Sequence, residues 1–327
     1  MNIIIKGEWI MKKLTIFLLI LVIMLVGCSN NDENAEDHKV NSTTKEETEA
    51  TTKKISTING EIEIPTKVER LVVDAYLPTS LLLGVKPVGA TQRDLENVHI
   101  QDQIDDIENT GESAIESILA LKPDLIITAQ ADAESYEKLS KIAPTVVLPY
   151  ETYRSVEEEV RGIAEILGKQ AEGEAWLKMF AEKVSENRGK LAEVLDPNET
   201  FSIFGAYSKD FYLYGDGIYR GGQAIYKQLQ LKAPQNIQKE LIETGETFKQ
   251  VSYEVLPEYA GDYIFLDESN GAELNREDSL WESMDAVKNN NVFYLDAKRF
   301  WPFDPIAVLA QVEEVTNMLL EKKKNEK

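Results

Sequence analysis

Side chains suited to binding an organic ligand gather near the predicted strand ends of the carboxyl-terminal half. They are Tyr207, Tyr212, Tyr214, Tyr219, Arg220, Arg299 and Trp301. Tyr212 and Tyr214 are two residues apart in a predicted strand, so they share one of its faces. Aromatic walls with a few cationic donors bind a compact ligand through apolar contact and charge-assisted hydrogen bonds. The pattern therefore indicates a binding site.

Residue types that would support catalysis or a protein-held metal are sparse. The chain has two His and one Cys, too few for the usual zinc clusters or for a disulfide within the chain. Neither a G-x-S-x-G elbow nor a P-loop occurs. The run from Gly215 to Gly221 is one residue too long for the dinucleotide-binding spacing. We expect no enzyme, no resident cofactor and no metal site.

Length and charge limit the remaining classes. The 327 residues, of which 43% are hydrophobic, are enough for two compact domains. Lys and Arg number 35 against 57 Asp and Glu, which gives a net charge of −22. Because so acidic a surface repels phosphate backbones, nucleic acid is not an expected partner.

The amino terminus is typical of an export signal. Lys12 and Lys13 precede an apolar run, Leu14–Val26, of 13 residues, which is too short to span a bilayer but suits a signal-peptide core. The small residue Gly27 stands directly before Cys28, the only cysteine, and this arrangement resembles the lipobox of bacterial lipoproteins. The resemblance implies a signal peptide over 1–27, lipidation of Cys28 and anchoring on the outer face of the cell membrane. An ordinary signal peptide is the alternative.

Residues 29–54 contain few apolar side chains, so we expect a disordered tether over 28–54. An alternating segment around Asn59-Gly60 predicts a β-hairpin from Ile55. Strands and helices then alternate, which predicts an α/β fold. We place an N-terminal α/β lobe at 55–165, a long rigid connecting helix at 166–198 and a C-terminal α/β lobe at 199–327. Asp304 and Pro305 predict the start of a last helix.

A repeated pattern supports two similar lobes. Glu116 stands early in a predicted helix, eight residues before Asp124, which opens an apolar strand. Glu254 and Asp262 repeat this arrangement 138 residues later.

Several segments resemble the helical-backbone (class III) substrate-binding lipoproteins of ABC importers, in particular the ferric siderophore, iron-hydroxamate type. The matching segments are Pro65–Val73, Gly84–Gly89, Glu116–Thr128, Tyr214–Asp216, Arg220–Tyr226, Tyr259–Ile264, Phe300–Trp301 and Asp304–Pro305. The resemblance implies two α/β lobes bridged by one long helix, with the ligand in a shallow cleft between them.

The same resemblance assigns roles to individual residues. Arg220 corresponds to a cation that binds ligand oxygens, and Trp301 to an aromatic wall. Because the siderophore already saturates its iron, the protein needs no metal ligands of its own. Ile218 stands where such proteins often have Trp, and Pro302-Phe303 replaces a more polar pair, so the siderophore itself stays open.

In the first lobe, Tyr76, Arg93 and Gln130 follow predicted strands and are candidates to face the cleft. Structural roles are the alternative for each candidate: strand tyrosines can belong to the core, Arg220 can pair within its turn, and Trp301 can pack before the last helix.

The resemblance also assigns Glu116 and Glu254 to salt bridges with arginines of the membrane permease, one in each lobe. Stabilisation of the helix dipole is the local alternative. A haem or cobalamin carrier of the same fold class is the main alternative function. An extracytoplasmic lipoprotein hydrolase using carboxylates finds no support in their spacing. A carrier of free metal finds little support, since His99 is the only histidine in the expected folded part.

Overall fold

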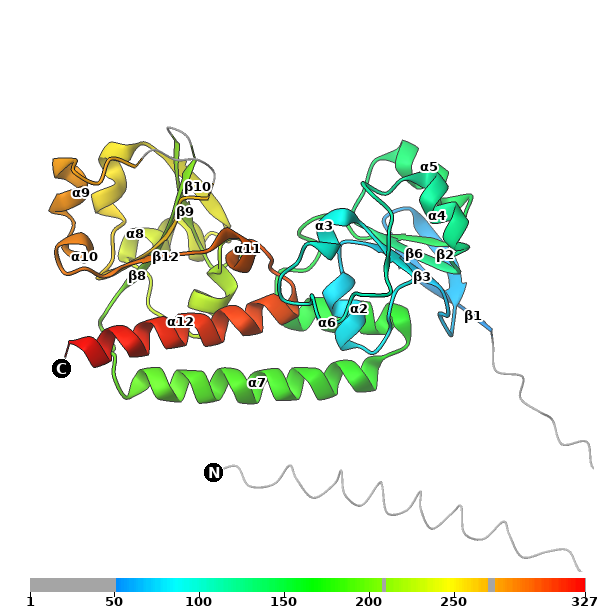
Figure 1. Ribbon diagram of the computed structural model, residues 1–327, viewed down its shortest axis with the longest axis horizontal. Coiled ribbons are helices and arrows are strands. Elements are labelled where there is room, and N and C mark those ends of the chain that lie inside the picture. Colours follow the sequence, from blue (N-terminus) through cyan, green and yellow to red (C-terminus); the bar gives the residue numbers. More distant parts are fainter. Residues whose placement is uncertain (1–50, 208–209, 270–273, 327) are drawn as a thin grey trace, which may run out of the picture. The chain divides into compact units, whose positions relative to one another are not determined.

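The computed structural model describes residues 51–207, 210–269 and 274–326 (Figure 1). The predicted signal peptide, Cys28 and most of the predicted tether lie outside the described residues. Within the described ranges, none of the helices combines the length and the apolar composition that crossing a membrane requires.

The described chain begins with the predicted hairpin. Strand β1 (Thr52–Thr57) pairs antiparallel with β2 (Gly60–Pro65), and Gly60 has the positive φ, 100°, that the turn needs. The hairpin starts at Thr52, so the tether boundary at residue 54 was three residues too late. Composition misled the prediction there, because Thr52 and Lys53 are held by backbone pairing to β2 rather than by burial of apolar side chains.

The first lobe contains a five-stranded parallel sheet in the order β5-β4-β3-β6-β7. Its strands are β3 (Leu71–Asp74), β4 (Gly89–Ala90), β5 (Glu108–Asn109), β6 (Leu125–Thr128) and β7 (Thr145–Val147). The helices of this lobe are α2 (Leu77–Leu82), α3 (Gln92–Leu95), α4 (Ile115–Leu121) and α5 (Ala133–Ser140). Strands β3 and β6 are almost entirely buried, as short apolar runs in a covered parallel sheet must be.

The second lobe contains a mixed sheet in the order β10-β9-β8-β11-β12. Its strands are β8 (Phe201–Tyr207), β9 (Asp210–Tyr214), β10 (Phe248–Val251), β11 (Tyr263–Asp267) and β12 (Val292–Tyr294). Strands β8, β11 and β12 are parallel. Strand β9 runs antiparallel to β8, and β10 runs antiparallel to β9. Its helical segments are η1 (Gln223–Gln228), α8 (Gln235–Ile237), η2 (Gln238–Ile242), η3 (Tyr253–Glu258), α9 (Ser279–Ser283), α10 (Asp285–Lys288) and α11 (Ala297–Phe300). The sequence did not predict β10.

Three longer helices join the lobes. Helix α6 (Val156–Leu167) ends at Gly168, whose φ of 68° allows the chain to turn before α7 (Gln170–Ala192) begins. The connecting helix is therefore shorter than the predicted 166–198. Helix α12 (Pro305–Asn325) starts at the predicted cap, where the Asp304 side chain accepts a hydrogen bond from the Ala307 amide. It lies beside α7 and also contacts α2 and α6 (Figure 1).

The repeated Glu–Asp pattern has a structural counterpart in both lobes. Asp124 accepts hydrogen bonds from the amides of Glu69 and Arg70, directly before β3. Asp262 accepts the equivalent bond from the Thr200 amide, directly before β8. Each aspartate thus joins the starts of two neighbouring parallel strands, and the two α/β lobes follow one plan.

Candidate functional site

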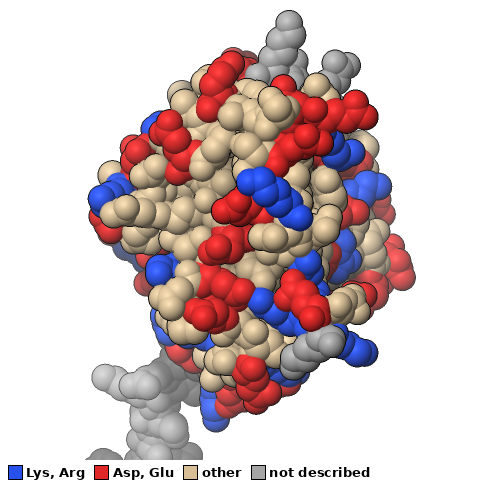
Figure 2. Space-filling model, turned by 90° about the vertical axis from the view of Figure 1, so that its left-hand side faces the viewer, with Lys and Arg blue, Asp and Glu red and all other residues tan. Residues whose placement is uncertain are grey.

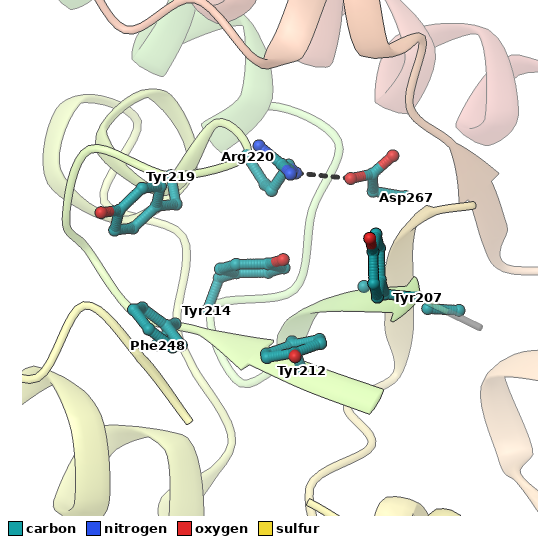
Figure 3. A pocket seen from close by; sticks show the side chains of 9 residues that line it. Tyr207, Tyr212, Tyr214, Tyr219, Arg220, Phe248 and Asp267 are labelled. Atoms are coloured by element: carbon teal, nitrogen blue, oxygen red, sulfur yellow. Dashed lines mark hydrogen bonds and ion pairs between the residues drawn. The ribbon is translucent and has the colours of Figure 1, made fainter. Parts of the chain in front are cut away.

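A hollow of about 310 Å³ lies over the carboxyl ends of β8 and β11 in the second lobe (Figure 3). It is lined by Gly205, Ala206, Tyr207, Tyr212, Tyr214, Tyr219, Arg220, Phe248 and Asp267. The predicted residues Tyr207, Tyr212, Tyr214 and Arg220 are therefore brought together. All the lining residues come from the second lobe.

The strand register explains the aromatic wall. Tyr212 pairs with Gly205 of β8, and Tyr214 pairs with Phe248 of β10. Because side chains alternate along a strand, Tyr212 and Tyr214 face the hollow while Leu213 between them is fully buried in the core. The predicted shared face is thus confirmed. Phe248 was missed because its short strand shows no clear alternation.

Gly205 makes room for the Tyr214 ring. A Cβ atom at Gly205 would lie 2.7 Å from that ring, so only glycine lets the ring lie over β8. Burial raises the pKa of Tyr214 to about 12, although the charge of Arg220 acts in the opposite direction. The Tyr214 hydroxyl therefore keeps its proton at neutral pH and can donate a hydrogen bond.

A tight loop after β9 carries Arg220 into the hollow. Arg220 and Gly221 both have positive φ, 50° and 79°. Gly222 packs so closely that a Cβ there would lie 2.2 Å from the Gly215 carbonyl oxygen. The close packing within this loop therefore explains why the run is rich in glycine, and no bound nucleotide is needed to account for it.

Arg220 is held by a carboxylate and two aromatic rings. Its Nε donates to Asp267 Oδ2 at 2.5 Å, as Figure 3 shows. Its Cζ lies 3.9 Å from the centre of the Trp301 ring and 5.7 Å from that of Tyr214, which are cation–π distances. The guanidinium is thus fixed against an aromatic ring while its terminal nitrogens remain able to reach a ligand.

Asp267 was not predicted. It is 2% exposed at the end of β11 and accepts hydrogen bonds from Trp301 Nε1 at 3.2 Å and from the Ser269 amide at 3.0 Å. Its signal was available, because it directly follows the apolar residues of the strand that the sequence predicts to open at Asp262.

Two predicted second-lobe residues lie beside the hollow rather than in its lining. Trp301 is 39% exposed and reaches the site by stacking on Arg220. Arg299 pairs through Nε with Glu314 of α12 at 2.5 Å. Arg299 is therefore directed to helix α12.

The three first-lobe candidates do not line the hollow. The Tyr76 hydroxyl donates to the Leu148 carbonyl at 3.2 Å, and its ring packs edge-on against Tyr153, 6.0 Å between centres. Gln130 follows β6, where its amide donates to the Thr128 hydroxyl. Arg93 is exposed on α3.

Tyr150, which the sequence analysis missed, brings the first lobe to the rim of the hollow. Its ring lies 6.3 Å from that of Tyr219 and 5.3 Å from that of Phe303. Burial raises the pKa of Tyr150, whereas the charges of Arg93 and Arg220 lower it. The charges of two guanidiniums, one from each lobe, thus act on one hydroxyl.

Glu116 and Glu254 occupy matching positions on the outer surface. Each is exposed in the first turn of its helix, α4 and η3 respectively. Across the described part of the chain, neither takes part in an ion pair with another side chain of the protein. Both carboxylates are therefore available to a partner.

Among residues 51–207, 210–269 and 274–326, no three His, Cys, Asp or Glu side chains converge as metal ligands would. The chemistry of the hollow is that of aromatic contact and hydrogen bonding.

Comparison with known proteins identifies relatives of this architecture. A family model described as periplasmic binding protein matches residues 79–299. Two iron(3+)-hydroxamate-binding proteins of Bacillus subtilis, YxeB and FhuD, are 35% and 33% identical, over 97% and 95% of this chain and 100% and 98% of theirs. The structure of FhuD2 from Staphylococcus aureus with bound ferrioxamine B matches with a TM-score of 0.69 and 25% identity, covering 78% of this chain and 100% of that one. The chain therefore belongs to the periplasmic binding protein family, whose members bind solutes rather than transform them.

Proposed function

We propose that this protein captures a ferric siderophore of the hydroxamate type outside the cytoplasmic membrane and delivers it to an ABC importer. The observation that supports this proposal most strongly is the hollow, in which four tyrosines and Phe248 surround one anchored guanidinium, Arg220. The two hydroxamate-binding relatives, which align over nearly their whole length, support the same ligand class.

The hollow suits a preformed iron complex. A ferric hydroxamate presents an apolar backbone and an outer ring of oxygen atoms around an iron that the chelator already saturates. The aromatic side chains contact the backbone, and Arg220 with the Tyr214 hydroxyl donates to the oxygens. Iron then enters as cargo inside its chelator, and the protein supplies no metal ligand and no cofactor.

Delivery requires a second surface, and we assign it to Glu116 and Glu254. The two exposed carboxylates have the same position in the two lobes, so one rigid permease face with two arginines can contact both at once. Charges of this kind act mainly on encounter and orientation and leave ligand affinity nearly unchanged.

Cys28 is proposed to carry the lipid anchor. The anchor would hold the protein at the outer face of the cell membrane, and the 23 residues 29–51, as the expected flexible tether, would reach roughly 25–30 Å. A Cys28→Ala variant is expected to leave the membrane fraction in a wash without detergent. Retention of that variant on the membrane would contradict the anchor.

The ligand assignment is tested by fluorescence titration of the mature protein with ferrioxamine B, haem and cobalamin. Ferrioxamine B is expected to quench the emission, and Trp301→Ala to remove most of the quench, because Trp301 stacks on Arg220. Trp176, stacked on Phe180 in α7, and the buried Trp281 provide a constant background. Saturable binding of haem or cobalamin with no response to the hydroxamate would overturn the proposal.

A further inference from the structure

The hollow contains one charge of each sign. Of the nine described residues that line it, Arg220 and Asp267 are the charged ones, and the other seven are tyrosine, phenylalanine, glycine or alanine. The pair is largely desolvated, since the side chain of Arg220 is 14% exposed and that of Asp267 is 2% exposed. At the rim, Glu151 accepts a hydrogen bond from the Tyr219 hydroxyl at 3.2 Å.

Asp267 has no capacity left to bind a ligand itself. Its Oδ2 accepts from Arg220 Nε and Trp301 Nε1, and its Oδ1 accepts from the amide and the hydroxyl of Ser269. A carboxylate has about four acceptor positions, and all of them are used. The effect of Asp267 on a ligand must therefore be exerted through the position and the charge of Arg220.

The distance between Arg220 and Asp267 determines the electrostatic field that acts on a ligand in the hollow. A lone guanidinium in a desolvated hollow attracts anions strongly, because Coulomb energies rise as the effective dielectric constant falls. With a carboxylate 2.5 Å from Nε, the same guanidinium presents a dipole, whose field falls off faster with distance. It can still donate hydrogen bonds, but it no longer favours net negative charge.

We propose that Asp267 sets the charge selectivity of the site, so that the hollow prefers neutral or cationic ferric complexes to anionic ones. The inference rests on the proposed function and names the ligand class more narrowly. Three hydroxamates balance the charge of ferric iron, whereas three catecholates leave three negative charges on the complex. The surrounding protein acts in the same direction, since its net charge is −22 and acidic side chains are spread over the face seen in Figure 2.

The test compares two probes, ferrioxamine B and a ferric tris-catecholate, by fluorescence titration of the wild type and Asp267→Asn. The variant keeps the size of the side chain but leaves Arg220 uncompensated. We expect the ratio of the two affinities to shift toward the catecholate by roughly tenfold or more. Asp216→Asn is the matched control, because it removes the same formal charge outside the lining and should keep the ratio within about twofold.

A double variant separates charge from structural damage. Arg220→Gln alone should shift the ratio further toward ferrioxamine B, because only the carboxylate remains. Adding Asp267→Asn to it makes the pair neutral again, and the ratio should return toward that of the wild type although both affinities are weaker. If Asp267→Asn alone does not fold, the comparison of Arg220→Gln with the double variant still measures the effect of the Asp267 charge.

The outcomes separate the two proposals. If the wild type does not bind ferrioxamine B, the proposed function fails. If it does bind, but the ratio is the same with and without Asp267 in both backgrounds, the charge-selectivity inference is wrong and the proposed function stands.

Discussion

The two sheets have the same strand order, but they differ on the side beyond the first central strand. In the first lobe, β4 and β5 are two residues long and run parallel to β3. In the second lobe, β9 is five residues long and returns antiparallel from β8. A longer antiparallel strand presents alternating side chains on a continuous face, and there it places Tyr212 and Tyr214 in the hollow. The longer antiparallel strand therefore lets the second lobe form the aromatic wall of the hollow on an architecture that both lobes share.

Carboxyl groups that are at least partly buried also differ in role between the lobes. In the first lobe, Asp74 accepts from the Thr128 hydroxyl and Asp94 from the Ala75 amide, so both stabilise the local chain. Burial raises the pKa of Asp94 to about 6. In the second lobe, Asp267 instead holds the guanidinium of Arg220. In this comparison, the proposed ligand site lies in the second lobe, whereas the proposed docking residues Glu116 and Glu254 come from both lobes.

The largest expected effect tests the proposal that both lobes contribute to docking. Glu116→Ala combined with Glu254→Ala should reduce uptake of iron from ferrioxamine B by roughly tenfold or more, with ligand affinity within about twofold. Uptake of radioactive iron by cells and titration of the purified protein measure the two quantities.

The matched control for docking is Glu112→Ala with Glu258→Ala, which removes one exposed carboxylate from each lobe near the proposed contacts. This pair should support normal uptake. Normal uptake by the Glu116 and Glu254 double variant, at equal protein level, would remove the docking assignment.

The next effect tests the lobe that binds. Arg220→Ala should weaken binding of ferrioxamine B by about 1.5–3 kcal/mol, because it removes a charge-assisted hydrogen bond and leaves Asp267 buried without its cation. Lys249→Ala is the control, because Lys249 pairs with Glu240 and does not line the hollow. Calorimetric titration measures both. Equal affinities for the two variants would place the ligand elsewhere.

A smaller effect tests the fit of the aromatic wall. Gly205→Ala would place a methyl group 2.7 Å from the Tyr214 ring, which must then move into the hollow. We expect binding to weaken by on the order of 1 kcal/mol, with the fold intact. Gly189→Ala in α7 is the control, since a Cβ there meets nothing within 4 Å. Affinity that is unchanged in Gly205→Ala would show that the Tyr214 ring is not a contact surface.

The smallest effect concerns a buried carboxyl group at the join between the lobes. Glu159 of α6 accepts a hydrogen bond from the Thr79 hydroxyl, and burial raises its pKa to about 8, helped by the nearby charge of Asp304. Between its ordinary pKa of 4.5 and this value, the unfolded chain loses the proton while the folded chain keeps it. The folded protein therefore loses stability as the pH rises across that range.

Glu159→Gln should remove this loss. We expect its melting temperature, relative to the wild type, to be roughly 2 °C or more higher at pH 8 than at pH 5. Thermal unfolding followed by circular dichroism at both pH values is the measurement. A constant difference between the two proteins would mean that Glu159 does not titrate as its burial requires.

Sequence patterns predicted the parts of the fold that depend on local chemistry. The Asn59-Gly60 turn and the Asp304 cap each have a signal within a few residues, and both are confirmed. The Asp124 and Asp262 repeat is also confirmed, although each aspartate bonds to an amide distant in the sequence. The strand β10 depends instead on pairing with β9, far along the chain, and its own residues alternate poorly.

The site residues also fall into those predicted from a local pattern and those that depend on contacts between distant segments. Tyr212 and Tyr214 were predicted from the period of one strand, and Arg220 from a motif. Phe248 and Tyr150 reach the hollow through contacts made in the folded protein, with Tyr214 and Tyr219 respectively. Such contacts between distant segments leave no periodic trace in a single sequence.

The central claim is that the second-lobe hollow holds the iron complex, and the anomalous scattering of iron tests it most directly. Crystals grown with ferrioxamine B should show one strong iron peak over the hollow formed by Tyr212, Tyr214 and Arg220. The peak should lie apart from any protein carboxylate, because the chelator keeps all the iron coordination. An iron peak away from this hollow, or an iron bound directly by carboxylates of the protein, would contradict the account.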